Sequence, residues 1–363
     1  MIARAEVTVS GSALRNNFRI LKKKVPALRL IPMVKADAYG HGAAFAARTL
    51  LREKGLHAFG VASFREAVEL RLSLGDSRVP VIVFSDSAPW TPEHSSLCIR
   101  YRLEPVLSEI ESLLHFQSLK ESRKVPYHVE LNTGMNRLGI PVDSLGCVQL
   151  PPESVFTHLA DADSPRSALT RTQIKRFESA LPGVRARFPR ALLHFANSAT
   201  IWNHREFPLL REMDLARPGL SLYGIRPFQK AREDGLKRVM RFSSRVLNRI
   251  HLEPGDRVGY GGTYVCKSKT GEWVGVIGAG YADGVFRSLS NSGFAVQGRK
   301  KLPFIGRVSM DLSAIRIPSS VRVGDELVLW GDEVDPYEQA GAAGTIPYEI
   351  TTRIGSRVER SDG

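Results

Sequence analysis

The sequence has little cysteine and no long apolar run. Cys98, Cys147 and Cys266 lie far apart and none belongs to a C-x-x-C pair, so neither a disulfide framework nor a structural zinc site is indicated. The longest apolar runs, such as VPVIVF at 79–84, have the length of a strand, not of a membrane span. The first residues, MIARAEVTVS, lack the apolar core of a secretory signal. These features predict a cytoplasmic protein with no membrane attachment.

Acidic residues are outnumbered, 37 against 51 Lys and Arg, which gives a formal net charge of +14. Apart from KKK at 22–24, the basic residues are scattered among acidic ones, and no nucleic-acid motif is present. We therefore expect a solvated basic surface and no nucleic-acid partner. A local positive field that attracts carboxylates or a phosphate is compatible with the same composition. The histidines include no pair at metal-ligand spacing, so we expect no metal site.

The first two-thirds of the chain alternates short apolar runs with longer amphipathic segments, which predicts an α/β fold. Helices are expected at 64–75 and 168–183. Strands are expected at 28–34, 57–63, 79–84, 127–132, 154–160, 192–198 and 216–224. Repeated strand–helix units imply parallel strands joined by right-handed crossovers. About eight such units in roughly 230 residues predict a closed (β/α)₈ barrel of the TIM type.

After about residue 235 the pattern changes to strands broken by turn signals. EPGD at 253–256, GYGG at 259–262 and VGDE at 323–326 separate segments of period-two alternation. A mainly β C-terminal domain is therefore predicted. The charged segment at 229–238 is the expected boundary, which gives domains of 8–235 and 236–363, and the first residues of the chain are a candidate strand of the second domain.

One lysine has an unusual setting. In LIPMVKADAYGHG at 30–42, Lys35 ends an apolar run and precedes Tyr39 and two glycines. Functional groups of a parallel barrel gather at the C-terminal ends of its strands. A lysine among apolar neighbours can have a lowered pKa, which frees its amine for Schiff-base chemistry. From this stretch alone, a solvated lysine at the start of a loop explains the pattern equally well.

Further polar residues fall at the ends of expected strands: Arg137, His158, Asn197, Ser198, Arg217 and Gly219. Each has a simple structural explanation, since a lone histidine in an apolar run is usually a core residue and Asn-Ser is usually a helix cap. Their joint placement on one face of a barrel favours a site. Backbone N–H groups around Ser198 and Gly219 are suited to holding a phosphate.

Ordered motifs in both halves of the chain resemble the alanine racemase family of pyridoxal 5′-phosphate (PLP) enzymes, from about residue 8 to about residue 358. The matching segments are VKADAYGHG (34–42), NTGMNRLG (132–139), FTHLADAD (156–163), HFANSA (194–199), RPGLSLYG (217–224), VGYGGTYV (258–265), GYADG (280–284), GRVSMD (306–311) and TIPYE (345–349). The resemblance implies a PLP-bearing barrel, a C-terminal β domain and a homodimer with shared active sites.

The resemblance also implies two catalytic bases. Lys35 would hold PLP covalently and act as one base, and Tyr260 from the partner subunit would be the other. Racemisation requires this pair, because one base removes the α-proton and the second delivers a proton to the opposite face. A tyrosine with an ordinary pKa near 10 is a poor base. The family pattern supplies positive neighbours through His158, which Arg217 orients.

Other cofactor and substrate positions follow from the same resemblance. Arg217 would face the pyridine nitrogen and leave it unprotonated, because a guanidinium does not readily release a proton, so PLP would be a weaker electron sink than in most PLP enzymes. The remaining expected cofactor-binding residues are Tyr39, Asn197, Ser198, Gly219 and Tyr348. The expected substrate-binding residues are Arg137 and the backbone at Met310, with Tyr281 narrowing the entrance and Asp311 nearby.

Two positions depart from the family pattern. Many members have a lysine seven residues before the Arg137 position, and its carbamylated form orients the arginine. Here that position is Glu130, and we hypothesise that its carboxylate replaces the carbamate; a solvent-facing strand residue is the alternative. The tail RVERSDG replaces the usual Arg-Val-Pro-Arg ending, which puts C-terminal contacts in doubt.

The expected function is therefore interconversion of L- and D-alanine, supplying D-alanine for peptidoglycan. A racemase of serine, lysine or several amino acids on the same fold is the nearest alternative. A decarboxylase of basic amino acids would need different residues from the partner in place of Tyr260. A non-enzymatic PLP-binding protein is disfavoured, because a carrier has no use for a second base.

Overall fold

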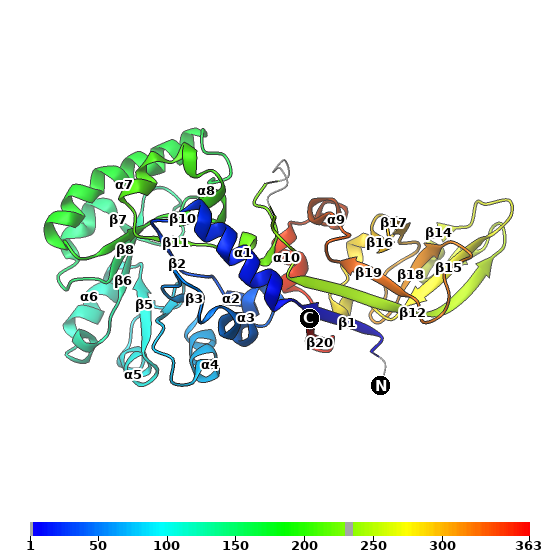
Figure 1. Ribbon diagram of the computed structural model, residues 1–363, viewed down its shortest axis with the longest axis horizontal. Coiled ribbons are helices and arrows are strands. Elements are labelled where there is room, and N and C mark those ends of the chain that lie inside the picture. The colour runs from blue at the N-terminus through cyan, green and yellow to red at the C-terminus, as the bar shows by residue number, and fades with distance from the viewer. Residues whose placement is uncertain (1–2, 229–234) are drawn as a thin grey trace.

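The computed structural model describes residues 3–228 and 235–363, which form a barrel and a β domain side by side (Figure 1). Within the described residues, eight parallel strands make the barrel. They are β2 (Arg29–Leu30), β3 (Phe59–Val61), β4 (Val81–Val83), β5 (Leu103–Leu107), β6 (His128–Asn132), β8 (Ser154–Phe156), β9 (Leu192–His194) and β11 (Leu215–Arg217). The predicted α/β barrel is confirmed.

Backbone hydrogen bonds join these strands into a closed ring. Strands β3 to β9 pair in order, with β7 (Ile140–Pro141) beside β6, and β10 (Ala196–Asn197) continues from β9 to pair with β11. Strand β11 then pairs with β2. The last gap is bridged by bonds from Val34 N to Gly60 O and from Gly60 N to Pro32 O, at 2.8 and 2.9 Å. The lack of an N–H on Pro32 shortens β2 without opening the barrel.

Helices surround the barrel and follow its strands. They are α1 (Gly11–Lys24), α2 (Lys35–Gly40), α3 (Ala43–Leu50), α4 (Phe64–Leu74), α5 (Pro92–Tyr101), α6 (Ile110–Ser118), α7 (Ala168–Arg187) and α8 (Ser198–Trp202). Helix α4 shows why they form: Ser63 and Glu66 make a capping box, and Ala67, Leu70 and Leu74 are buried at helical spacing. No helix in the described part of the chain is long and apolar enough to cross a membrane.

The barrel interior is partly apolar and partly polar. Ile31, Met33, Ala58, Ile82, Val106, Phe156 and Leu215 form a separate buried cluster. Because side chains alternate along a strand, residues two positions away from these point inward too. Glu104 precedes Val106 by two positions, Ser154 precedes Phe156 and Arg217 follows Leu215 in the same way. Charged and hydroxyl groups therefore share the interior with the apolar cluster.

The β domain is built on one long strand, β12 (Met240–Leu252), and carries two helices, α9 (Pro336–Ala343) and α10 (Pro347–Thr352). Its other strands are β13 (Arg257–Val258), β14 (Tyr264–Val265), β15 (Glu272–Ile277), β16 (Phe294–Gln297), β17 (Lys300–Pro303), β18 (Ser313–Ile317), β19 (Glu326–Trp330) and β20 (Glu359–Asp362). Strand β1 (Ala5–Val9) pairs with β12 and β20, so the two ends of the chain lie in this sheet. The predicted boundary at 235/236 remains a prediction, since 229–234 of its segment lie outside the described residues.

The expected strands were in part too long, and β5 and the two-residue β7 were missed. The segment 216–224 is a strand only to Arg217, because Pro218 and Gly219 break it and the 3₁₀ turn Leu220–Tyr223 follows. The segment 154–160 is a strand only to Phe156. Strand β5 was not expected, because Glu104 and Pro105 interrupt its apolar pattern.

The two domains meet next to the loop that follows Lys35. Helix α10 of the β domain packs on α2. Gly40 has a φ of +84°, and a Cβ there would lie 2.1 Å from Thr351 O, so only glycine allows this approach. The contact brings Tyr348 of α10 to the C-terminal end of the barrel.

Candidate functional site

A pocket lies at the C-terminal ends of the barrel strands and gathers most of the predicted residues. The predicted residues that line it are Lys35, Tyr39, Glu130, Arg137, His158, Asn197, Ser198, Arg217, Gly219 and Tyr348. Sequence reasoning did not predict the other lining residues, which are Met33, Phe84, Ser85, Leu138, Phe156, Ala199 and Leu220. These additions are mostly apolar and lie among the charged and polar residues that were predicted.

Lys35 is held by a strained backbone segment. Residues 36–39 all have φ between +50° and +56°, a left-handed turn of four non-glycine residues that costs about 1–2 kcal/mol per residue. Hydrogen bonds of 2.7 Å from Ala36 N to Glu66 and from Ala43 N to the Asp37 carboxylate hold this turn. Strain of this kind persists only where the surroundings fix it, and it is concentrated at functional sites.

The electrostatic setting of Lys35 disfavours its ammonium form. Burial lowers the pKa of Lys35, and the positive charges of Arg137 and Arg217 lower it further, while Glu66 acts in the opposite direction. The neutral amine is therefore populated at a lower pH than in an exposed lysine. A neutral amine is the form that attacks a carbonyl carbon.

Arg217 lies at the pocket floor with only 4% of its surface exposed. Its Nη2 donates to Thr157 O at 2.9 Å and to His158 Nδ1 at 3.2 Å, and its Nη1 donates to His194 Nδ1. Its guanidinium also stacks 4.6 Å from the centre of the Phe156 ring. Burial lowers the pKa of Arg217 to about 10, which leaves it charged at neutral pH.

His158 is neutral in this setting, so the expectation that it supplies a positive neighbour for Tyr260 is wrong. Burial, followed by the charges of Arg217, Arg137 and Lys35, lowers the pKa of this histidine to about 3. Arginine has only donors, so His158 Nδ1 must accept the bond from Arg217, and the imidazole proton must lie on Nε2. Arg217 thus fixes the tautomer of His158 and leaves it one N–H to donate.

A set of hydroxyl donors lines the pocket around Gly219. Ser198 Oγ accepts bonds from Gly219 N at 3.0 Å and Ser221 N at 3.3 Å, so its own proton is available to a ligand. A Cβ on Gly219 would lie 2.5 Å from the hydroxyl of Tyr39, whose ring is 6.1 Å from that of Tyr348. Burial raises the pKa of both tyrosines, so both keep their O–H donors. This donor set fits a phosphate group.

Glu130 is the acidic group of the pocket. It lies on β6 and is only 6% exposed, which excludes the solvent-facing alternative considered above. Burial raises its pKa, while the charges of Arg217 and Arg137 lower it. Its negative charge therefore depends on these two arginines, and it compensates them in return.

The remaining predicted residues, Tyr260, Tyr281, Met310 and Asp311, do not line this pocket. Tyr260 is 73% exposed and borders a separate hollow on the β domain, together with Val258 and Arg307. Within one chain the predicted residues therefore do not all meet: ten line the barrel pocket, Tyr348 of the β domain among them, and four lie elsewhere on the β domain.

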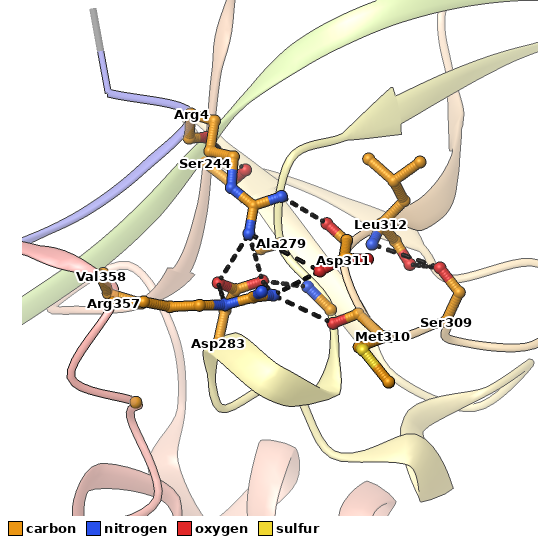
Figure 2. A network of polar contacts seen from close by, with 12 residues as sticks. Arg4, Ser244, Ala279, Asp283, Ser309, Met310, Asp311, Leu312, Arg357 and Val358 are labelled. Carbon is orange, nitrogen blue, oxygen red and sulfur yellow. Dashed lines mark hydrogen bonds and ion pairs between the residues drawn. The ribbon is translucent and has the colours of Figure 1, made fainter.

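A charged network holds the loops that carry Tyr281 and Met310 (Figure 2). The buried carboxylate of Asp283 accepts bonds from Arg357 at 2.7 Å, Arg4 at 3.1 Å and Gly280 N at 2.8 Å. Arg357 also contacts Asp311 at 2.8 Å. Both ends of the chain thus fix these loops, and the tail keeps a structural contact despite its unusual ending.

Two contacts of Arg217 were missed by sequence reasoning. His194 was passed over inside the segment 192–198, although a histidine at the end of an apolar strand was a usable signal. Thr157 contributes only its backbone carbonyl, which leaves no mark on the sequence. In the described part of the chain, no group of three or more His, Cys, Asp or Glu side chains is placed to hold a metal.

Comparison with known proteins identifies the family. Residues 9–227 match the family described as "Alanine racemase, N-terminal domain", and residues 239–362 match "Alanine racemase, C-terminal domain". The chain belongs to the alanine racemase family.

Individual relatives match over their full length. An alanine racemase of Nitrosococcus oceani is 35% identical over 98% of both chains, and one of Deinococcus radiodurans is 35% identical over 100% of both. Among solved structures, alanine racemase from Bartonella henselae with covalently bound pyridoxal phosphate has a TM-score of 0.88, with 28% identity and full coverage of both chains. Alanine racemase from Streptomyces coelicolor A3(2) also has a TM-score of 0.88, with 29% identity, and covers 98% of this chain and 97% of its own.

The lowered pKa of Lys35 predicts that its amine reacts at a lower pH than the amine of an ordinary lysine. In protein without cofactor, reductive methylation by formaldehyde and cyanoborohydride will reach half its maximal rate at a lower pH for Lys35 than for the lysine of an unstructured peptide in the same sample. Substituting Arg137→Gln removes a positive neighbour and will shift the Lys35 midpoint upward. Peptide mass spectrometry across a pH series measures both lysines. Equal midpoints for the two residues would contradict the electrostatic account.

Proposed function

We propose that this protein interconverts L-alanine and D-alanine with PLP bound in the barrel pocket. The observation that carries the proposal is the convergence of a low-pKa lysine, a buried arginine and a phosphate-sized donor set, in a chain that matches alanine racemases along its whole length. Supply of D-alanine for peptidoglycan, in the cytoplasm, is the biological role that we propose. The free thiols of Cys98, Cys147 and Cys266 agree with a reducing compartment.

The residues of the pocket fit PLP. The Lys35 amine would bind it covalently, and the phosphate would lie among Ser198, Gly219 and the hydroxyls of Tyr39 and Tyr348. Asn197 supports this side by accepting a 3.0 Å bond from Thr200 N at the start of α8. Arg217 would face the pyridine nitrogen. When bound, PLP supplies an electron sink for the negative charge that develops at the substrate α-carbon.

Racemisation then needs one base on each face of the α-carbon. Lys35 serves one face, and Tyr260 of the partner subunit serves the other. The exposure of Tyr260 and its absence from the pocket of its own chain support an origin in a second copy. The Nε2–H of His158, whose tautomer Arg217 fixes, can donate to the tyrosine oxygen.

Arg137 and the backbone of Met310 would hold the substrate carboxylate, and Tyr281 with Asp311 would narrow the entrance. Met310, Tyr281 and Asp311 belong to the β domain, so they act in the same site as Arg137 only if a head-to-tail homodimer brings one chain's β domain to the other's barrel. The ion pairs of Asp283 would then keep in place the loops that reach the barrel pocket of the second subunit (Figure 2).

The direct test is stereochemical. PLP-loaded protein incubated with pure L-alanine will bring the optical rotation to zero, and Lys35→Ala will lower the rate by at least about 10²-fold through loss of a base. Circular dichroism follows the loss of rotation. An intact cofactor band without loss of rotation would reject alanine as substrate, and serine and lysine would be tested next.

Glu130 is proposed to hold Arg137 in position through its charge. A raised pKa means that Glu130 gains its proton at a higher pH than an ordinary glutamate, so the KM for L-alanine will rise as the pH falls. Substituting Glu130→Gln will raise KM about tenfold at neutral pH and remove the acid-side rise, by loss of the negative charge that attracts Arg137. Initial rates across a pH series measure this, with the exposed Glu111→Gln as the matched control. An unchanged KM and pH profile in Glu130→Gln would refute the role.

A further inference from the structure

A chain of polar side chains leads from Arg217 away from the pocket. Arg217 Nη1 bonds to His194 Nδ1, and His194 Nε2 lies 3.0 Å from Ser154 Oγ. Ser154 Oγ lies 2.7 Å from His128 Nδ1, and His128 Nε2 lies 3.0 Å from Glu104 Oε2. Five side chains from five different strands are thus joined by four hydrogen bonds.

This series of hydrogen-bonded side chains crosses the interior of the barrel. It begins at the C-terminal ends of β11 and β9 and ends near the N-terminal ends of β8, β6 and β5. His194, Ser154 and His128 are at most 1% exposed, and the Glu104 side chain is 17% exposed. Burying so many polar groups in place of apolar side chains is favourable only when each of them is hydrogen-bonded.

The chemistry of the two ends fixes the direction of every bond. Arginine has only donors, so His194 Nδ1 accepts and its proton lies on Nε2. An ionised carboxylate has only acceptors, so His128 donates through Nε2 and accepts at Nδ1. Ser154 Oγ then accepts the hydrogen bond from His194 Nε2–H, and its own O–H donates to His128 Nδ1. Each proton that takes part in these four hydrogen bonds has an acceptor, and all four bonds run from donor to acceptor in the direction from Arg217 to Glu104.

Other protonation states do not satisfy this arrangement. A protonated His194 would direct an N–H at the guanidinium of Arg217, and burial together with the charges of Arg217, His128 and His57 lowers the pKa of His194 well below its ordinary value. A protonated His128 would donate to Ser154 as His194 does, and the Ser154 proton would have no acceptor in the chain. Two neutral imidazoles, each protonated on Nε2, are the consistent state.

We propose that Glu104 is a positioning residue for Arg217, acting through His128, Ser154 and His194. Its carboxylate sets the direction of the hydrogen bonds, so that His194 presents an unprotonated nitrogen to Arg217. This nitrogen holds the guanidinium in its place at the pocket floor. The direction of these hydrogen bonds does not depend on any reaction that the protein catalyses. The effect on turnover rests on the proposed function, in which Arg217 faces the PLP ring.

The proposal predicts that loss of the Glu104 carboxylate reverses the direction of each hydrogen bond in the series as far as His194. In Glu104→Leu, His128 has no acceptor for Nε2–H, so its proton moves to Nδ1, where it donates to Ser154. Ser154 then donates to His194 Nε2, and His194 carries its proton on Nδ1, facing Arg217. Two donors cannot bond to each other, so Arg217 must shift. Glu104→Gln keeps an amide oxygen as acceptor and preserves the original direction.

The test is ¹⁵N NMR of the histidine rings in the PLP-bound protein, with signals assigned by single histidine substitutions. Wild type and Glu104→Gln will show His128 and His194 as neutral Nε2–H tautomers, and Glu104→Leu will convert His194 to the Nδ1–H form. An Nδ1–H or doubly protonated His194 in the wild type would overturn the proposal, even if Glu104→Leu fails to fold. Unchanged tautomers in a folded Glu104→Leu would overturn it as well.

Kinetics provide the second readout. For L-alanine, Glu104→Leu will lower kcat at least about tenfold and change KM little, because the shifted Arg217 acts on the cofactor and not on substrate binding. Glu104→Gln will retain most of the kcat, and so will Glu153→Gln, the matched control, which alters an exposed carboxylate next to Ser154. Equal kcat values for Leu and Gln at position 104 would contradict the proposal. If the wild type lacks racemase activity, the proposed function fails, and the NMR result still decides the direction of the chain.

Discussion

The buried positive charge of Arg217 governs the electrostatics of this molecule. Its guanidinium lies inside the barrel, where the loss of hydration must be offset by hydrogen bonds and a nearby carboxylate. Burial lowers the pKa of Lys35 and His158, and the charge of Arg217 lowers both further and helps to keep Glu130 ionised. Together with burial and the charge of Arg137, this buried arginine therefore contributes to three features of the pocket: an amine of lowered pKa, a neutral imidazole of defined tautomer and a carboxylate whose charge is favoured.

Much of the barrel site could be predicted from sequence because a parallel barrel brings strand ends together. Lys35, His158 and Arg217 were recognised as polar residues that follow apolar runs, and the structure places all three in one pocket. The family motifs added residues of the β domain, such as Tyr348, whose approach to the barrel depends on the close contact of α10 with Gly40. No local pattern encodes that contact.

The features that sequence reasoning missed depend on long-range contacts. Strand β5 was hidden because Glu104 breaks its apolar pattern, and this half-buried residue finds its partner, His128, only on the next strand. The left-handed turn after Lys35 contains no glycine until Gly40, so its backbone was unexpected. The bonds between Asp283 and the two ends of the chain join residues far apart in sequence.

The central claim is that each active site combines Lys35 of one chain with Tyr260 of another, and subunit mixing tests it most directly. Lys35→Ala and Tyr260→Phe are purified separately and then dissociated and reassociated together in equal amounts. Random pairing makes half of the dimers mixed, each with one complete site, so the account predicts recovery of about a quarter of the wild-type racemisation rate. A mixture no more active than the separate variants would contradict the claim.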